Sequence, residues 1–127
     1  MRLFLVRHAE AAPGDPDDLR PLTEAGRAAA RALGDRLAVQ RPDAVLSSPL
    51  LRARETAEAI ARAAGLAAET DERLAPGTTV ETLRESVSGR GETVVAVGHQ
   101  PDLGRIVHAL TGREVAFPPG AATEVSL

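Results

Sequence analysis

Short apolar runs alternate along this chain with segments of helical periodicity. Residues 3–6 form the first run, and four apolar residues in succession are typical of a strand buried on both faces. Residues 44–46 form a second run. Residues 92–98 form a longer one, rich in β-branched residues, that we expect at the centre of the sheet. This alternation predicts an α/β fold, a three-layer α/β/α sandwich with a mainly parallel central sheet.

Helix signals lie between these runs. The first helix is expected to have Thr23 as its N-cap. Its apolar face repeats every three or four residues, at Gly26, Ala30, Leu33 and Leu37. The second helix is expected to begin at Pro49, with Ser48 as its N-cap, and to run to Ala64. Gly26 has two interpretations that stay open, a close approach of the helix to the sheet or a weak point in the helix.

The C-terminal half continues the alternation. A short extended piece is expected within residues 66–74, and a helix is expected over residues 80–87. The helix that follows the third run is expected to end at Gly112. Residues 122–127 are predicted to form the last strand, at an edge of the sheet.

Composition excludes several classes of protein. The chain has 127 residues, of which 43% are hydrophobic, and this predicts one globular domain over residues 1–127. The absence of cysteine excludes disulfides, cysteine-bound metals and thiol catalysis. A net charge of −3 and only two aromatic side chains argue against nucleic acid as a partner. No apolar stretch approaches membrane-spanning length and no signal-peptide pattern is present, so we expect no membrane partner and a cytoplasmic location.

Reactive side chains follow all three runs. Arg7 and His8 come directly after the first run, and His99 comes directly after the third. Arg52 lies near the start of the helix that follows the second. The carboxyl ends of parallel strands meet at one edge, where helix N-termini add N–H groups that suit a phosphate. A guanidinium binds phosphate oxygens and an imidazole can act as a nucleophile, so we expect a phosphate site there, rimmed by residues 9–20.

Four stretches in chain order resemble a known family. They are residues 5–9 (LVRHA), 21–26 (PLTEAG), 47–57 (SSPLLRARETA) and 97–99 (VGH). Together they resemble the histidine phosphatase superfamily, and most closely its short SixA-type phosphohistidine phosphatases. The family often has glycine where this chain has Ala9. The resemblance implies a phosphoglycerate mutase-like fold and a single histidine phosphatase domain over residues 1–127.

The resemblance also implies a role for each reactive side chain. His8 would be the nucleophile and would carry a covalent phosphohistidine intermediate. Arg7 and Arg52 would bind the phosphoryl oxygens, and His99, protonated beside a dianion, would stabilise the transition state. Ser48 would donate a hydrogen bond to the phosphate or would only cap its helix. Neither a metal nor a cofactor is implied.

The sequence does not identify the residue that would act as the general acid. Larger members of the family place an acid in the segment after the second helix, where this chain has Arg73. Asp71, Glu72 and Glu10 are the candidate proton donors that remain. A phosphorylated imidazole is a better leaving group than an alkoxide and depends less on such an acid.

These arguments favour a metal-independent phosphatase that acts on a phosphohistidine of a partner protein. The chain lacks the long insertions that would enclose a small substrate, and an open site admits a protruding phosphohistidine. One alternative is a phosphatase for small phosphomonoesters such as sugar or nucleotide phosphates. An alternative of another class is a non-catalytic phosphate-binding regulatory domain. A mutase is less expected, because little would hold a phosphorylated intermediate for re-transfer.

Overall fold

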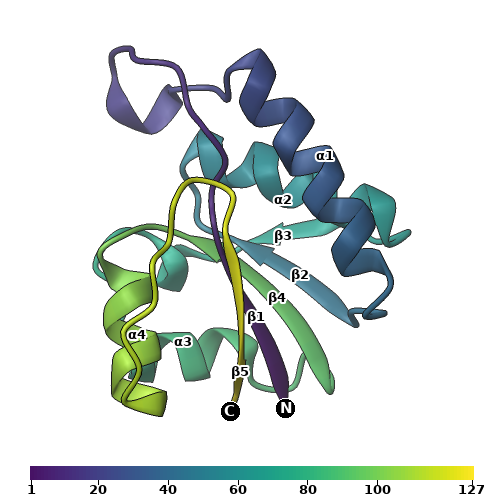
Figure 1. The fold of residues 1–127 in the computed structure, drawn as a ribbon, viewed down its shortest axis with the longest axis vertical. Helices are drawn as coiled ribbons and strands as arrows, with labels where there is room; N and C mark the ends of the chain where they lie inside the picture. Colours follow the sequence, from purple (N-terminus) through teal and green to yellow (C-terminus); the bar gives the residue numbers. More distant parts are fainter.

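A five-stranded sheet forms the centre of the computed structural model, which describes residues 1–127 (Figure 1). Its strands are β1 (Arg2–Arg7), β2 (Ala44–Ser47), β3 (Ala68–Thr70), β4 (Thr93–Gly98) and β5 (Ala122–Ser126). Their order across the sheet is β3-β2-β4-β1-β5. Only β5 pairs in the antiparallel sense, at the edge beside β1. The predicted mainly parallel sheet, with residues 92–98 near its centre, is therefore confirmed.

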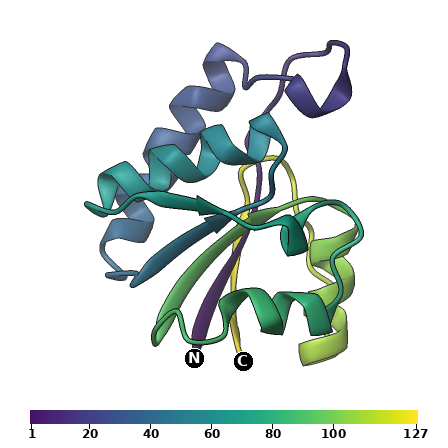
Figure 2. The same ribbon diagram turned by 180° about the vertical axis from the view of Figure 1, so that it is seen from behind.

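Four helices cover the two faces of the sheet, as Figures 1 and 2 show from opposite sides. They are α1 (Glu24–Ala38), α2 (Leu51–Ala63), α3 (Val80–Val87) and α4 (Asp102–Thr111). Helices α1 and α2 cover one face of the sheet, and α3 and α4 cover the other. This arrangement confirms the predicted three layers. Two short 3₁₀ turns complete the fold, η1 (Asp17–Leu19) and η2 (Glu72–Leu74). None of the helices has both the length and the apolar character that crossing a membrane requires.

The two layers of helices explain why the first apolar run is continuous. Successive side chains of a strand point to opposite faces of the sheet. Leu3 and Leu5 of β1 therefore pack into the apolar cluster under α3 and α4. Phe4 and Val6 pack into the cluster under α1 and α2. All four are buried, so the end of β1 is held rigidly where the reactive residues begin.

The start of α1 is tied to the segment that follows β1. Thr23 is the N-cap, as predicted, and its side-chain oxygen accepts a hydrogen bond from the backbone N–H of Gly26 at 2.9 Å. A side chain at Gly26 would overlap the backbone carbonyl of Glu10. Of the two interpretations of Gly26, a close approach is the one observed, but the approach is to the loop after β1 and not to the sheet.

The predicted start of α2 is wrong by two residues. The helix begins at Leu51 with Leu50 as its N-cap, and Ser48 does not cap it. The reason is that the backbone N–H of Ser48 donates to the carbonyl of Val97, so Ser48 still belongs to the hydrogen-bond ladder between β2 and β4. This extension of the sheet carries Ser48 to the carboxyl edge and places Arg52 in the first turn of α2.

Candidate active site

One pocket lies at the carboxyl ends of β1 and β4, beside the start of α2. Its volume is about 380 Å³, and eight residues line it: Arg7, His8, Asp17, Arg20, Arg52, Pro76, His99 and Gln100. The four residues that the sequence placed at this edge, His8, Arg7, Arg52 and His99, thus meet in one pocket. The rings of His8 and His99 are neighbours in it, with centroids 5.4 Å apart and ring planes inclined by 53°.

His8 is held at the end of β4 with one ring nitrogen engaged by the backbone. Its backbone N–H donates to the carbonyl of Gly98, which holds the residue against the end of β4. The ring Nδ1 lies 2.8 Å from the carbonyl oxygen of Ala9. A carbonyl only accepts, so Nδ1 carries the proton and Nε2 keeps its lone pair. Burial is the largest cause that lowers the pKa of His8; the hydrogen bond to Ala9 opposes it and the charges of the surrounding arginines add to it, so the ring is neutral at pH 7.

The guanidinium of Arg7 is only partly hydrogen-bonded to the protein. Its Nη1 donates to the carbonyl of Phe117 at 2.9 Å, which fixes one side of the guanidinium. Its Nε is buried and has no hydrogen-bond partner in the protein. A buried donor without a partner is costly, so the protein alone leaves this guanidinium incompletely hydrogen-bonded.

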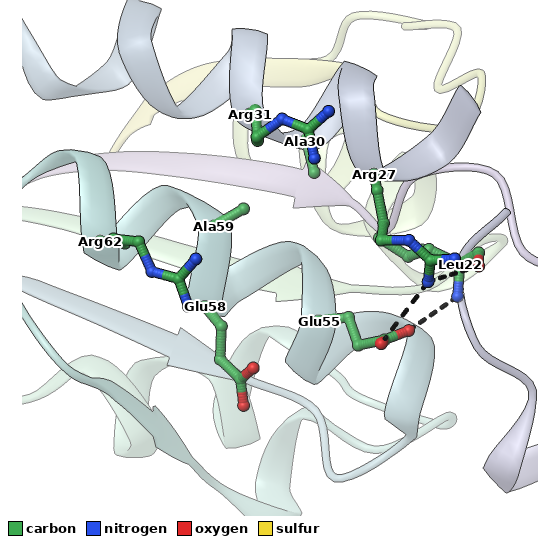
Figure 3. Close-up of a pocket in the computed structure, with 8 residues that line it drawn as sticks. All are labelled: Leu22, Arg27, Ala30, Arg31, Glu55, Glu58, Ala59 and Arg62. Atoms are coloured by element: carbon green, nitrogen blue, oxygen red, sulfur yellow. Dashed lines mark hydrogen bonds and ion pairs between the residues drawn. The ribbon is translucent and has the colours of Figure 1, made fainter. Parts of the chain in front are cut away.

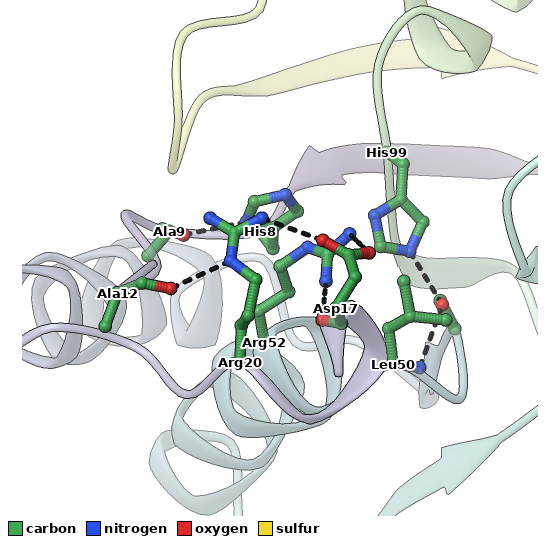
Figure 4. Close-up of polar contacts among 9 residues, drawn as sticks. His8, Ala9, Ala12, Asp17, Arg20, Leu50, Arg52 and His99 are labelled. Atoms are coloured by element: carbon green, nitrogen blue, oxygen red, sulfur yellow. Dashed lines mark hydrogen bonds and ion pairs between the residues drawn. The ribbon is translucent and has the colours of Figure 1, made fainter. Parts of the chain in front are cut away.

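Arg52 connects the pocket to the loop after β1 (Figure 4). Its Nη1 donates to the backbone carbonyl of Asp17 at 2.8 Å, and its Nη2 lies 3.2 Å from the carboxylate of the same residue. Arg20 donates to the other carboxylate oxygen of Asp17 at 3.0 Å. Hydrogen bonding from Arg20, followed by the charge of Arg52, lowers the pKa of Asp17. The side wall of the pocket is therefore an ionised carboxylate held between two guanidinium groups.

Asp17 and Arg20 are pocket residues that the sequence did not single out. The loop of residues 9–20 was expected to rim the site because it follows His8, and the structure confirms that position. Its proline and acidic composition indicates a loop but carries no periodicity that would show which side chains turn inward. The one usable signal was the spacing of the pair, since Asp17 and Arg20 lie three residues apart around the single turn η1.

His99 is buried, with 5% of its surface exposed. Its Nε2 lies 2.7 Å from the hydroxyl of Ser48. Burial is the largest cause that lowers the pKa of His99, to about 4, and it is followed by repulsion between the charged forms of His99 and His8 and by the charge of Arg52. The ring is therefore neutral at pH 7 in the protein alone. The expected protonation of His99 beside a bound dianion stays a prediction. Ser48 is fully buried and contacts His99 but does not line the pocket, so it is not placed to bind the phosphate itself.

None of the three candidate proton donors lines the pocket. The carboxylate of Glu10 accepts a hydrogen bond from the hydroxyl of Thr23 at 2.7 Å, which holds it against the start of α1. Both carboxylate oxygens of Asp71 accept from Arg73, and this pairing lowers the pKa of Asp71. Glu72 is exposed. These side chains were selected by distance along the chain, and local pairing directs two of them elsewhere.

A second groove lies between α1 and α2, and Figure 3 shows the residues that line it. Glu55 accepts from the backbone N–H of Leu22 at 2.7 Å and lies 4.0 Å from Arg27. The charged side chains there are of both signs, and the groove contains neither a histidine nor a strand end. This groove is the interface between two packed helices. The histidines and arginines expected to be reactive lie in the pocket of His8.

The lowered pKa of His99 predicts that the protein loses stability as the pH falls from about 6.5 to about 4. In that window the unfolded chain binds a proton at this ring and the folded protein does not, so protonation favours unfolding. The full shift corresponds to about 3 kcal/mol, and screening in a pocket open to solvent reduces this to ~1–2 kcal/mol.

Urea unfolding of the wild type and of His99→Gln at neutral pH and near pH 4.5 measures this contribution. The free energy of unfolding should fall less with pH in the variant than in the wild type. An equal fall in both proteins would show that His99 titrates normally in the folded state.

Comparison with known proteins identifies the family. Residues 3–76 match the sequence model of the histidine phosphatase superfamily (branch 1). An uncharacterized protein of Picosynechococcus sp. is 36% identical over 120 residues, covering 87% of this chain and 73% of that protein. The structure of the protein histidine phosphatase SixA complexed with tungstate is 30% identical, with a TM-score of 0.87 over 100% of this chain and 88% of that one. The SixA protein of Agrobacterium tumefaciens is 31% identical, with a TM-score of 0.81 over 97% of this chain and 89% of that one.

Proposed function

The chain belongs to the histidine phosphatase superfamily, and we propose that it hydrolyses a phosphohistidine on a partner protein through a covalent intermediate on His8. The observation that carries this proposal is the state of His8. Its Nδ1 proton is held by the carbonyl of Ala9, which leaves Nε2 with a lone pair in a pocket lined by three arginines. A neutral imidazole surrounded by guanidinium groups is suited to attack a phosphoryl group whose oxygens those groups bind.

In the first step, Nε2 of His8 forms a bond to phosphorus as the bond from phosphorus to the substrate nitrogen breaks. The phosphoryl group moves to His8, and the substrate imidazole, which carries a proton on its other ring nitrogen, leaves as a neutral ring. Arg7 and Arg52, which both line the pocket, bind the phosphoryl oxygens. His99 donates a further hydrogen bond from the opposite side of the pocket. Phosphoryl transfer depends mainly on such positioning and charge stabilisation.

In the second step, water attacks the phosphorus of the phosphorylated His8. A bond from oxygen to phosphorus forms and the bond from phosphorus to Nε2 breaks, so inorganic phosphate is released and His8 returns to its neutral form. The hydrogen bond from Nδ1 to Ala9 holds the ring in the same orientation through both steps.

The choice of a phosphohistidine follows from the carboxylates around the site. An alkoxide leaving group needs a proton donor, and Asp17 is the one carboxyl residue that lines the pocket. Its pKa is lowered by Arg20 and Arg52, which makes it a poor acid. An imidazole leaving group has less need of a donor. The resemblance to SixA, a protein histidine phosphatase, supports the same choice.

An assay of substrate preference tests the proposal. Purified protein is given a histidine-containing protein phosphorylated with phosphoramidate, and separately a panel of a sugar phosphate, a nucleoside monophosphate and p-nitrophenyl phosphate. We expect phosphate release from the phosphohistidine protein at a kcat/KM at least about 10-fold above any ester, and unchanged release in the presence of a chelator. A preference for the esters would replace the proposed substrate.

The matched control in that assay is His8→Ala. Release that is equal and near zero in the wild type and in the variant, with inorganic phosphate still bound, would instead support a non-catalytic phosphate-binding domain. The expected cytoplasmic location and the identity of the partner protein stay predictions.

A further inference from the structure

We propose that Ser48 is a positioning residue that fixes the proton of His99 on Nδ1, so that a neutral imidazole donates a hydrogen bond into the pocket. The sequence had offered Ser48 as a phosphate ligand or a helix cap, and the structure places it in neither position. The inference about the proton stands on hydrogen-bond geometry alone. Its catalytic consequence rests on the proposed phosphatase function.

The Ser48 hydroxyl has two partners within hydrogen-bond distance. This oxygen has two lone pairs and one proton to place, and the residue is fully buried. The backbone N–H of Leu50 donates to it at 3.2 Å, which uses one lone pair. The other neighbour within hydrogen-bond distance is Nε2 of His99, at 2.7 Å. The neighbouring hydroxyl of Ser47 is not involved, because it donates to the carbonyl of Ser48 at 2.6 Å.

Only one arrangement places every proton. If Nε2 carried the proton and donated to Ser48, the hydroxyl proton would have no acceptor, and a buried donor without a partner is costly. If the hydroxyl donates to Nε2, both groups are satisfied. Nε2 of His99 then bears a lone pair, and a neutral ring with a lone pair on Nε2 carries its proton on Nδ1.

The orientation of the ring gives this proton a function. In Figure 4, Nδ1 of His99 lies on the side of the ring toward the carboxylate of Asp17, while Nε2 points away to Ser48. An N–H directed into a pocket that binds anions is a donor for a phosphoryl oxygen. The pKa of His99, lowered to about 4, agrees with a neutral ring in this position.

His8 and His99 then have opposite roles although both carry the proton on Nδ1. The carbonyl of Ala9 accepts from Nδ1 of His8, so that ring presents a lone pair to the phosphorus. Ser48 donates to Nε2 of His99, so that ring presents an N–H to the oxygens. Two neutral imidazoles 5.4 Å apart are thus differentiated by a backbone acceptor on one and a hydroxyl donor on the other.

Nitrogen NMR of histidine-labelled protein tests the tautomer directly. In the wild type we expect the shifts of His99 to show a protonated Nδ1 and an unprotonated Nε2 at neutral pH. Ser48→Ala should shift the ring toward a mixture of tautomers. Ser47→Ala removes the same atom one residue away without touching His99, and should leave the spectrum unchanged. A wild-type His99 protonated on Nε2, or an unchanged tautomer in Ser48→Ala, would overturn the proposal.

Kinetics test the consequence for the reaction. Ser48→Ala should lower kcat by about 10- to 100-fold and change KM by less than about 3-fold, because the donor acts mainly on the transition state. Ser47→Ala should stay within about 2-fold of the wild type, and Ser48→Thr, which keeps the hydroxyl, should recover most of the loss. Circular dichroism checks that each variant folds. If the wild type shows no turnover, the proposed function fails while the NMR result still decides the tautomer.

Discussion

Replacing His8 with alanine is expected to lower phosphate release by roughly 10⁴-fold or more, because the substitution removes the atom that forms the bond to phosphorus. The effect should fall on kcat, since Arg7, Arg52 and His99 remain to bind the phosphoryl oxygens. Inorganic phosphate should therefore still inhibit binding of a labelled anion to the variant with a similar inhibition constant.

The covalent intermediate gives the more direct measurement. Wild-type protein mixed with substrate and quenched in alkali, where phosphohistidine survives, should gain the mass of one phosphoryl group, and peptide mapping should place it on His8. The matched control is His108→Ala. That histidine is 57% exposed on α4 and lies beside Glu114, away from the pocket. A phosphoryl group found on His99, or on His108, would contradict the assignment of the nucleophile.

The positions of His8 and His99 could be predicted from the sequence for a simple physical reason. Apolar runs buried on both faces indicate parallel strands, and the ends of parallel strands lie on one edge of the sheet. Residues directly after such runs, as His8 and His99 are, need no tertiary information to be placed. The start of α2 was misplaced because the preference for serine before proline says nothing of the hydrogen bond from Ser48 to Val97.

The loop contacts could not be predicted in the same way. Asp17 and Arg52 are separated by 35 positions in the chain, and their pairing depends on how an irregular loop folds back over α2. The position of Asp71 differs from this case, because its partner, Arg73, is two residues away and a pairing that close can be anticipated from the sequence.

Replacing Arg52 with alanine is expected to lower kcat/KM by about 10³-fold or more, comparable with the loss of a guanidinium that stabilises a transferring phosphoryl group. Arg52 is 8% exposed and contributes two donors directed along the wall of the pocket. Arg52→Lys keeps the positive charge but lacks the planar guanidinium with its paired N–H donors, and it should recover only part of the activity. Arg54→Ala is the control, because Arg54 lies on the same helix but donates to the carbonyl of Pro49 outside the pocket.

Arg52 also holds the loop after β1, so a loss of activity alone does not show that it binds the phosphoryl group. Asp17→Asn separates the two roles. This variant keeps the backbone carbonyl that accepts from Nη1 of Arg52 but removes the negative charge that competes with a phosphoryl group for the arginines. If Arg52 binds the substrate, Asp17→Asn should lower the inhibition constant of inorganic phosphate several-fold while Arg52→Ala raises it. If Arg52 serves only to anchor the loop, both substitutions should weaken phosphate binding, because each loosens the same contact.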